Sequence, residues 1–546
     1  MNAAELFVQC LENEGVEYIF GIPGEENLNV MDALINSKIK FITTRHEQGA
    51  AFMADVYGRL TGKAGVCLAT LGPGATNLVT GFADANMDRA PIVGIAGQGA
   101  TTRMHKESHQ VLDLVNLFKP ISKYSVQIHE PEIVPEIVRK AFKNAQAEKP
   151  GGSFISFPEN IAEQALAGAK KAPLKVQSPK PPVPPQEKIH QAAKVIAAAR
   201  FPIAMAGNGV IRANASTSLV AFAEKLNLPI ANTFMAKGVM PFSHPLSLGT
   251  VGLQAHDYVA CGFDRADVVI TVGYDMVEYH PHLWHAGKDK KIIHIDMNAA
   301  EVDEHYILEC GVVGDINAAL ENIATETPAR GDEHISTLRA TIVDELGADA
   351  SDAGFPIKPQ KIIWDLREVL APDDIVISDV GAHKMWMARM YQAERPNTCI
   401  ISNGFASMGI AVPGVMAAKL AFPDRKAVAV TGDAGFLMNS QEIETMLRHG
   451  VAAVILVWTD SEYGLIKWHQ LRRFGRETQI GFTNPDLVKY ADSFGAKGYR
   501  IENTSDLKST LEEALNQNTL TVIDCPVDYS ENMRLTEKLG NLVCPV

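Results

Sequence analysis

The chain lacks several features that would each assign it to a class of protein. No apolar run approaches the roughly 18 residues that a membrane-spanning helix needs, so no membrane association is expected. The net charge of −14 at pH 7 leaves no basic excess, which argues against a nucleic-acid partner. Residues 1–6 lack the charged and apolar segments of a secretory signal, so none is expected.

Cysteine is scarce, and its spacing gives no sign of a metal site. The seven cysteines are scattered, and no two form a CxxC pair, so zinc is not supported. An odd, unclustered set of cysteines predicts reduced thiols and a cytoplasmic protein.

Length and composition predict a globular protein of several domains. At 100–200 residues per domain, the 546 residues correspond to about three domains. Two irregular stretches divide the chain, the proline-rich residues 177–186 and residues 349–359. We therefore expect domains at residues 1–176, 187–330 and 356–546.

Each of these blocks alternates apolar, β-branched runs with amphipathic runs. Continuous apolar runs separated by helices indicate parallel sheets that are covered on both faces. The predicted fold is therefore α/β, with three consecutive doubly wound parallel-sheet domains. One helix should begin near His46 and end at Gly62. The strand-like runs are residues 15–24, 40–47, 63–74, 91–97, 202–210, 266–275, 290–298, 374–381, 426–435 and 452–460.

Two aspartates end two successive apolar runs of the third block. Asp433 follows the run 426–431, and Asp460 follows the run 452–458. A strand–helix–strand unit places both strand ends at one edge of a sheet, where ligands bind. Two hard oxygen ligands beside a glycine turn suit a Mg²⁺ ion that also holds a diphosphate. The alternative is an ordinary pair of loops, because turns favour Asp and Gly in any case.

The segment around Asp433 resembles the thiamin-diphosphate motif, Gly-Asp-Gly followed after a helix and a strand by Asn-Asn. The resemblance implies that Asp433, Asp460 and the backbone carbonyl of Glu462 bind the metal. It also implies that the turn holds the diphosphate. The chain departs from the motif at Ala434, which adds a methyl group, and at Thr459-Asp460, which adds a negative charge. The implied turn residues are Gly432, Asp433, Ala434 and Gly435.

Glu47 stands in the segment 45–53, RHEQGAAFM, which is similar to the catalytic-glutamate segment of thiamin-diphosphate enzymes. The resemblance implies that Glu47 hydrogen-bonds the pyrimidine ring of the cofactor. That contact favours the ring tautomer that removes the C2 proton of the thiazolium. The alternative role is a first-turn acid that only stabilises the helix dipole.

The resemblance implies further cofactor-binding residues in several loops. Met408 stands where a bulky apolar side chain bends the cofactor, although a methionine is more often core filler. The other implied residues are Pro23, Gly72, Asn77, Gly381, Ala382, His383, Gly404, Tyr463, Gly464 and Leu465.

The resemblance spans essentially the whole chain and is closest to the acetolactate synthases, which join two pyruvates with loss of CO₂. Residues 272–279 look like the catabolic, flavin-independent type, so thiamin diphosphate and Mg²⁺ are expected and FAD is not. The turn at residues 207–209 lacks the full dinucleotide fingerprint and is more often structural. The resemblance implies a substrate pocket with a catalytic Gln110 and three neighbours, His109, Leu465 and Trp468.

Some features leave the substrate and assembly open. Acids at residues 25–26 stand where the catabolic relatives carry a basic residue, Trp468 occupies a variable position, and His109 has the alternative of a surface histidine. In the family, the first domain of one subunit faces the third domain of another. A homodimer is therefore the expected minimum, and a homotetramer is expected. The alternatives are another thiamin-diphosphate decarboxylase, lyase or carboligase, a non-catalytic binding homologue, and a flavin or nicotinamide oxidoreductase.

Overall fold

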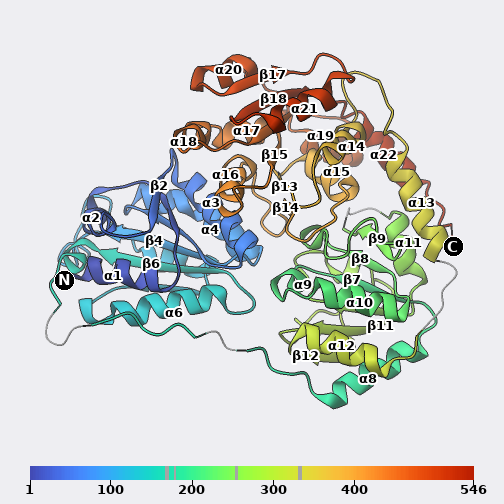
Figure 1. Ribbon diagram of the computed structural model, residues 1–546, viewed down its shortest axis with the longest axis horizontal. Helices are drawn as coiled ribbons and strands as arrows, with labels where there is room; N and C mark the ends of the chain where they lie inside the picture. Colours follow the sequence, from blue (N-terminus) through green and yellow to red (C-terminus); the bar gives the residue numbers. More distant parts are fainter. Residues whose placement is uncertain (167–170, 178–179, 253–255, 330–334, 546) are drawn as a thin grey trace.

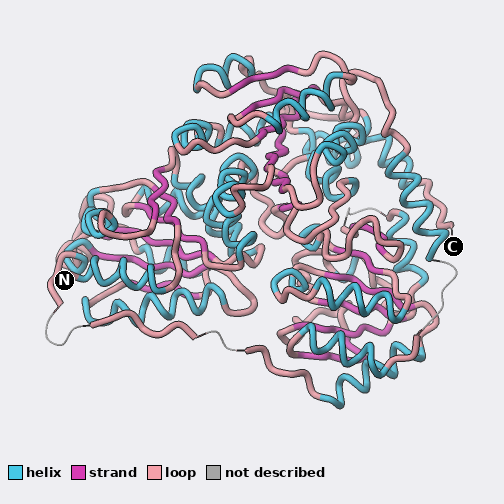
Figure 2. The backbone as a smooth tube through the Cα atoms, in the orientation of Figure 1, coloured by secondary structure: helices cyan, strands magenta, loops and turns pink. Residues whose placement is uncertain are grey.

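Three six-stranded sheets organise the chain, one in each third of the sequence. The computed structural model describes residues 1–166, 171–177, 180–252, 256–329 and 335–545. Strands lie between layers of helices in all three units (Figures 1 and 2). Neighbouring strands in the three sheets run parallel, so the predicted fold class is confirmed.

The first sheet has the strand order β2-β1-β3-β4-β6-β5. Its third helix begins at Glu47, where the His46 side chain caps the Gln48 N–H, and ends before Gly62 in the left-handed conformation, as predicted. The strands are Tyr18–Gly21 (β1), Lys40–Thr43 (β2), Gly65–Ala69 (β3), Ile92–Gln98 (β4), Tyr124–Gln127 (β5) and Gly152–Pro158 (β6). The helices are Ala3–Asn13 (α1), Leu28–Leu34 (α2), Glu47–Thr61 (α3), Pro73–Met87 (α4), Leu114–Phe118 (α5), Val134–Gln146 (α6) and Glu159–Ala162 (α7).

The central sheet has the order β12-β11-β10-β7-β8-β9. Read from β9, this is the order 3-2-1-4-5-6 of doubly wound dinucleotide-binding folds. The strands are Pro202–Ala206 (β7), Ile230–Asn232 (β8), Ser247–Thr250 (β9), Val268–Val272 (β10), Lys291–Asp296 (β11) and Leu308–Val313 (β12). The helices are Gln186–Ala198 (α8), Gly209–Arg212 (α9), Ser216–Leu226 (α10), Tyr258–Arg265 (α11), Ile316–Glu326 (α12) and Ile335–Gly347 (α13).

The third sheet has the order β14-β13-β15-β16-β18-β17. The strands are Ile375–Ser378 (β13), Cys399–Ile401 (β14), Ala427–Gly432 (β15), Val454–Thr459 (β16), Lys497–Arg500 (β17) and Thr521–Pro526 (β18). The helices are Pro359–Val369 (α14), Ala382–Met390 (α15), Ala411–Ala421 (α16), Asp433–Asn439 (α17), Glu442–Arg448 (α18), Gly464–Phe474 (α19), Leu487–Phe494 (α20), Asp506–Asn516 (α21) and Glu531–Gly540 (α22).

The first and third units share one hydrophobic core. Helix α3 packs against α16, and residues such as Phe52 and Met416 belong to the same buried cluster. Beside this contact the buried Arg59 pairs with three aspartates of α3 and α4 and donates to the Ile401 carbonyl of β14. Such a pairing is needed because an unpaired charge is costly to bury. The two outer units are therefore held together by apolar packing and a buried ion network.

Every predicted apolar run coincides with a strand, namely β1 to β4, β7, β10, β11, β13, β15 and β16. The predicted breaks at 177–186 and 349–359 contain no strand in their described residues, and α8 and α14 begin at their ends, while residues 178–179 lie outside the described part. The exact domain limits stay a prediction. Of the helices in the described part of the chain, none combines the length and apolar composition of a membrane span.

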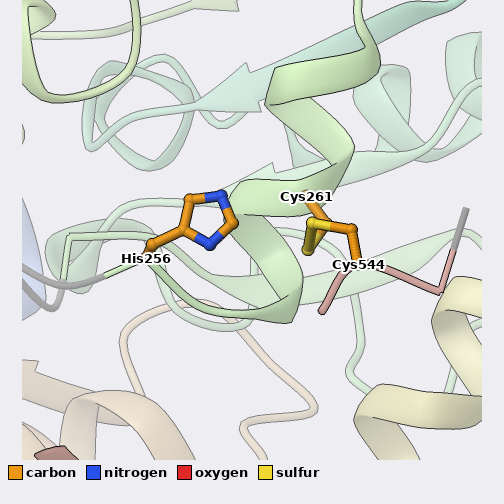
Figure 3. Close-up of side chains that lie close together, drawn as sticks. All are labelled: His256, Cys261 and Cys544. Carbon is orange, nitrogen blue, oxygen red and sulfur yellow. A yellow bond between two sulfur atoms is a disulfide. The ribbon is translucent and has the colours of Figure 1, made fainter. Parts of the chain in front are cut away.

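One expectation about cysteine is wrong. Cys261 of α11 is bonded to Cys544 in a disulfide, although reduced thiols were predicted (Figure 3). The pair is 283 residues apart in the sequence, so its spacing gave no sign of it, and folding brings the Cα atoms to 5.6 Å. The other five cysteines are free and buried.

Candidate active site

Asp433 and Asp460 lie together at the carboxyl edge of the third sheet, as their spacing predicted. Asp433 is the first residue of α17, directly after β15, and Asp460 directly follows β16. The Asp433 carboxylate accepts hydrogen bonds from the backbone N–H groups of Asp460 (3.2 Å) and Ser461 (2.7 Å). Because β15 and β16 are paired neighbours in the sheet, the two acids lie at adjacent strand ends.

A third oxygen-bearing side chain completes this cluster. Asn484 donates from Nδ2 to Asp433 Oδ2 (2.7 Å). Its own Oδ1 and the Oδ2 atom of Asp460 are buried and have no hydrogen-bond partner among the described residues. Burial and then the charge of Asp433 raise the pKa of Asp460 to about 7. Two carboxylates and an amide, with the Asp460 and Asn484 oxygens unused by the rest of the described chain, have the composition that a divalent cation requires. Sequence reasoning missed Asn484, which no motif marked.

The residues after Asp460 crowd the same cluster. The side chain of Glu462 forms an ion pair with Lys467 of α19 at 2.7 Å, so its carboxylate points toward that lysine. A Cβ on Gly464 would lie 3.2 Å from Asp460 Oδ2, so this position keeps the backbone close to the acid. Tyr463 precedes α19 and is largely exposed. These predicted residues therefore border the Asp460 side of the cluster.

The loop at the start of α15 meets the glycine turn before Asp433. A Cβ on Gly432 would lie 3.3 Å from His383 Nδ1, so the two loops touch. Burial lowers the pKa of His383 to about 3, so its imidazole is neutral. Its Nε2 atom is buried without a partner. With Gly381 and Ala382 just before it, this loop offers an unused polar atom beside the turn.

Asp379 fastens the loop that carries Met408. Its carboxylate accepts from the backbone N–H groups of Gly409 (2.8 Å) and Ala411 (3.1 Å), and burial raises its pKa to about 6. Met408 itself is half-buried. Sequence reasoning missed Asp379, although its place after the run of β13 is the same strand-end signal that identified Asp433.

Gly404, on the same loop as Met408, faces the first unit. Its N–H donates to the carboxylate of Asp88, which also accepts the Asn403 N–H (2.9 Å). The nearest neighbours of a Cβ at this glycine would be Asp88, Val277 and Met87. The N–H of Gly404 is therefore already used within this chain.

Glu47 and its neighbours form a second group at the edge of the first sheet. Glu47 is 8% exposed and is the first residue of α3. Asn77 of α4 donates from Nδ2 to Glu47 Oε2 at 3.0 Å. A Cβ on Gly74 would lie 3.4 Å from Glu47 Oε1. The predicted Glu47 and Asn77 are therefore in direct contact.

The predicted Gly72 and Gln110 also lie side by side. Gly72 has a φ of 55°, and a Cβ there would lie 2.9 Å from Gln110, so both backbone angle and space favour glycine. His109 is exposed beside Gln110, and Pro23 is exposed after β1. These residues surround the same edge of the first sheet as Glu47.

Glu442 connects the two groups within one chain. Its buried carboxylate accepts from the backbone N–H groups of Arg45 (3.1 Å) and His46 (3.1 Å), directly before Glu47. Among the described residues, no hydrogen bond or ion pair joins Glu47 to Asp433. Sequence reasoning missed Glu442, which lies nine positions after Asp433 in a helix with no recognised motif.

A cavity of about 670 Å³ opens between the central and third units. Leu465 and Trp468, predicted for the substrate pocket, line it, whereas His109 and Gln110 do not. Trp468 donates from Nε1 to Thr536 of α22 at 2.8 Å. Burial lowers the pKa of Lys384, which also lines the cavity, to about 8. The other lining residues include Phe234, Asn403, Ala406, His469 and Arg472.

Comparison with known proteins identifies the family to which these three units belong. Family models of thiamine pyrophosphate enzymes match residues 1–117 (N-terminal TPP binding domain), 189–323 (central domain) and 379–525 (C-terminal TPP binding domain). An acetolactate synthase of Bacillus subtilis (strain 168) is 37% identical, with 97% of this chain and 94% of the relative covered. The chain belongs to the acetolactate synthase family.

Two further relatives support this membership. A probable acetolactate synthase large subunit of Methanocaldococcus jannaschii is 35% identical over 100% of this chain and 96% of its own length. A catabolic acetolactate synthase of Raoultella terrigena is 34% identical, with 98% and 97% covered. The predicted family and the predicted thiamin diphosphate are therefore confirmed. In this acetolactate synthase family member, the two TPP binding domains contain the Glu47 group and the Asp433 group.

Proposed function

We propose that this chain joins two pyruvate molecules, with loss of CO₂, to form 2-acetolactate, and that it needs thiamin diphosphate and Mg²⁺. The observation that carries the proposal is the buried oxygen cluster of Asp433, Asp460 and Asn484 at the edge of the third sheet. The names of the full-length relatives support the reaction.

The third unit has the residues to hold a metal and a diphosphate. The unpartnered oxygens of Asp460 and Asn484 fit a divalent cation, with Asp433 between them. The neutral His383 and the N-terminus of α17 face the same turn, where an anion is favourable. The bound cofactor supplies a carbon nucleophile and takes up the electrons released with CO₂.

In the first unit, Glu47 would hydrogen-bond the pyrimidine ring of the bound cofactor and exchange a proton with it. Asn77 donates a hydrogen bond to the Oε2 atom of Glu47, and the Oε1 atom of Glu47 lies on the side of Gly74. A carboxyl group within reach of a ring nitrogen acts as a general acid–base group. Asn77 therefore orients Glu47, and Glu442 fixes the backbone from which Glu47 begins.

A homodimer as the minimum, and a homotetramer as the working assembly, are part of the proposal. Within the part of the chain that the structure describes, Glu47 and Asp433 share no polar contact, which fits a site completed by a second copy. Phe405 and Met438, each 42% exposed, lie on the loop and helix next to these groups. Exposed apolar side chains at this place support an interface with a second copy.

The cavity supports an anionic substrate. Lys384 and Arg472 line it, and a cation in a half-buried cavity attracts the carboxylate of a 2-keto acid. The same feature fits another 2-keto-acid decarboxylase or carboligase, which is the second candidate. Leu465 and Trp468 would limit the size of the substrate side chain.

FAD is not part of the proposal. The Asn208 N–H at the glycine turn of the central sheet is bonded to the Glu278 carboxylate at 3.1 Å, where a dinucleotide phosphate would need the donor. A cytoplasmic location, expected from the scattered cysteines, stays a prediction.

The test is incubation of the purified protein with pyruvate, with and without thiamin diphosphate and Mg²⁺, followed by product analysis. We expect 2-acetolactate and CO₂ only when both are present. Acetaldehyde without acetolactate would favour the second candidate. An absorbance spectrum of the isolated protein checks for flavin.

A further inference from the structure

A covalent cross-link joins the C-terminal tail to the central unit. Cys261 lies on α11, and Cys544 lies four residues beyond the end of α22 (Figure 3). The link adds a covalent bond where Leu542 and Cys544 already pack against the apolar cluster that contains Cys261.

The cross-linked tail forms a wall of the substrate cavity. Leu539, Gly540 and Leu542 line the 670 Å³ cavity, together with His256 on the central unit. Trp468 lines the same cavity and donates to Thr536 of α22. The disulfide thus joins the two sides of one opening, because its cysteines lie just beyond Leu542 and just after His256.

The tail has few other attachments beyond α22. The helix is held by the Trp468–Thr536 hydrogen bond and by the ion pair of Lys538 with Glu345 at 3.0 Å. Leu542 makes the last backbone hydrogen bond of the described tail, and Val543 is 83% exposed. In the described residues 543–545, the disulfide is the one covalent or polar attachment to the rest of the chain. Its loss would leave the tail with the apolar packing of Leu542 and Cys544, while α22 stays docked.

The surroundings of the disulfide suit thiol chemistry. A ring nitrogen of His256 lies within 4.8 Å of both sulfur atoms, and His256 pairs with Asp264 of α11 at 2.5 Å. Thiol–disulfide exchange passes through thiolates, so His256 places a polar ring nitrogen next to the sulfur atoms that would exchange. Cys261 is buried and Cys544 is half-buried, so a small thiol reaches the pair from the Cys544 side.

We propose that Cys261 and Cys544 are a reversible thiol–disulfide modification site that closes the tail over the substrate cavity. A dithiol reductant supplies two electrons and two protons, the S–S bond breaks to give two thiols, and the reductant becomes a cyclic disulfide. Oxidation by a small-molecule disulfide runs the reverse exchange and releases two small thiols. The effect on turnover rests on the proposed function, whereas the cross-link itself does not.

The test compares the full-length protein, isolated without reductant, before and after treatment with dithiothreitol. Mass spectrometry after alkylation should find one Cys261–Cys544 disulfide that dithiothreitol removes. Carboxypeptidase should release the last residues faster after reduction, and the KM for pyruvate should rise several-fold with a smaller change in kcat. Cys544→Ser should behave like the reduced protein, while Cys310→Ser, at a free buried cysteine of the central unit, should behave like the oxidised one.

Three results would overturn the proposal. The first is alkylation of both thiols in protein that never met a reductant. The second is a metal ion retained one per chain, with the thiols reactive only after chelation, since His256, Cys261 and Cys544 would then be ligands. The third is equal carboxypeptidase sensitivity of Cys544→Ser and Cys310→Ser. Alkylation and proteolysis need no pyruvate turnover, so failure of the proposed reaction remains distinguishable.

Discussion

The first and third units have the same sheet but different chemistry at its edge. The orders β2-β1-β3-β4-β6-β5 and β14-β13-β15-β16-β18-β17 are the same when each unit is numbered from its own first strand. The turn after the third strand contains Gly72 in the first unit and Asp433 in the third. The fold thus supplies two equivalent edges, and single residues after the strands decide what each can bind.

The charges at the edges of the first and third sheets explain why the two edges differ in chemistry. Burial, and then repulsion by the nearby Asp433 carboxylate, raise the pKa of Asp460 to about 7. A divalent cation relieves this repulsion. Glu47 instead meets the neutral amide of Asn77. We infer that the third edge is built for a metal and the first for a proton.

Replacing Glu47 tests whether the first edge does the proton chemistry. We expect Glu47→Gln to retain thiamin diphosphate and Mg²⁺ but to lose about 10²- to 10⁴-fold in kcat, the usual size of a general acid–base contribution. Steady-state kinetics and cofactor titration measure both effects. Glu136→Gln, another first-turn acid on α6, is the matched control. Full turnover of Glu47→Gln would remove the first edge from the reaction.

Replacing Asn484 tests whether the third edge is a metal site. The Asn484 amide holds Asp433, and loss of a group that orients a metal ligand typically lowers metal affinity by about 10- to 100-fold. Asn484→Ala should therefore need more Mg²⁺ for half-maximal activity, with Asn503→Ala as the surface control. If the Mg²⁺ dependence did not change, the backbone donors of residues 460 and 461 alone would position Asp433.

The sequence predicted those strands and site residues that depend on short, local patterns. Buried strands such as β10 and β15 gave the predicted apolar runs, whereas β8 and β14 have three residues each and are too short to show a periodicity. Asp433 and Asp460 came from strand ends and a motif. Asn484, Glu442 and the Cys261–Cys544 bond join segments far apart in the chain, so only folding brings their partners together.

Replacing Glu442 tests whether the two edges are linked within a chain. Glu442→Ala removes the acceptor of the part-buried N–H groups of Arg45 and His46, at a cost of up to about 1–3 kcal/mol each. We expect kcat to fall several-fold through the misplaced Glu47, with little change in KM. Glu442→Gln, which keeps an acceptor oxygen, should recover part of the loss. The half-buried neighbour Glu444 supplies the control Glu444→Ala, and equal kinetics of the two alanine variants would contradict the link.

We expect the smallest effect in the central unit. The Glu278 carboxylate already accepts the N–H group of Asn208 at the glycine turn of its sheet, and no cofactor is proposed to bind there. Burial and then the charge of Asp275 raise the pKa of Glu278 from 4.5 to about 7. The folded state therefore binds a proton that the unfolded state has released, so stability from this group is complete below pH 4.5 and is lost as the pH rises through 7. Thermal midpoints measured from pH 5 to about pH 8 should fall less with pH in Glu278→Gln than in the wild type. Glu301→Gln, at an exposed position of the same unit, should follow the wild type, and parallel curves for all three proteins would show that Glu278 does not titrate in this range.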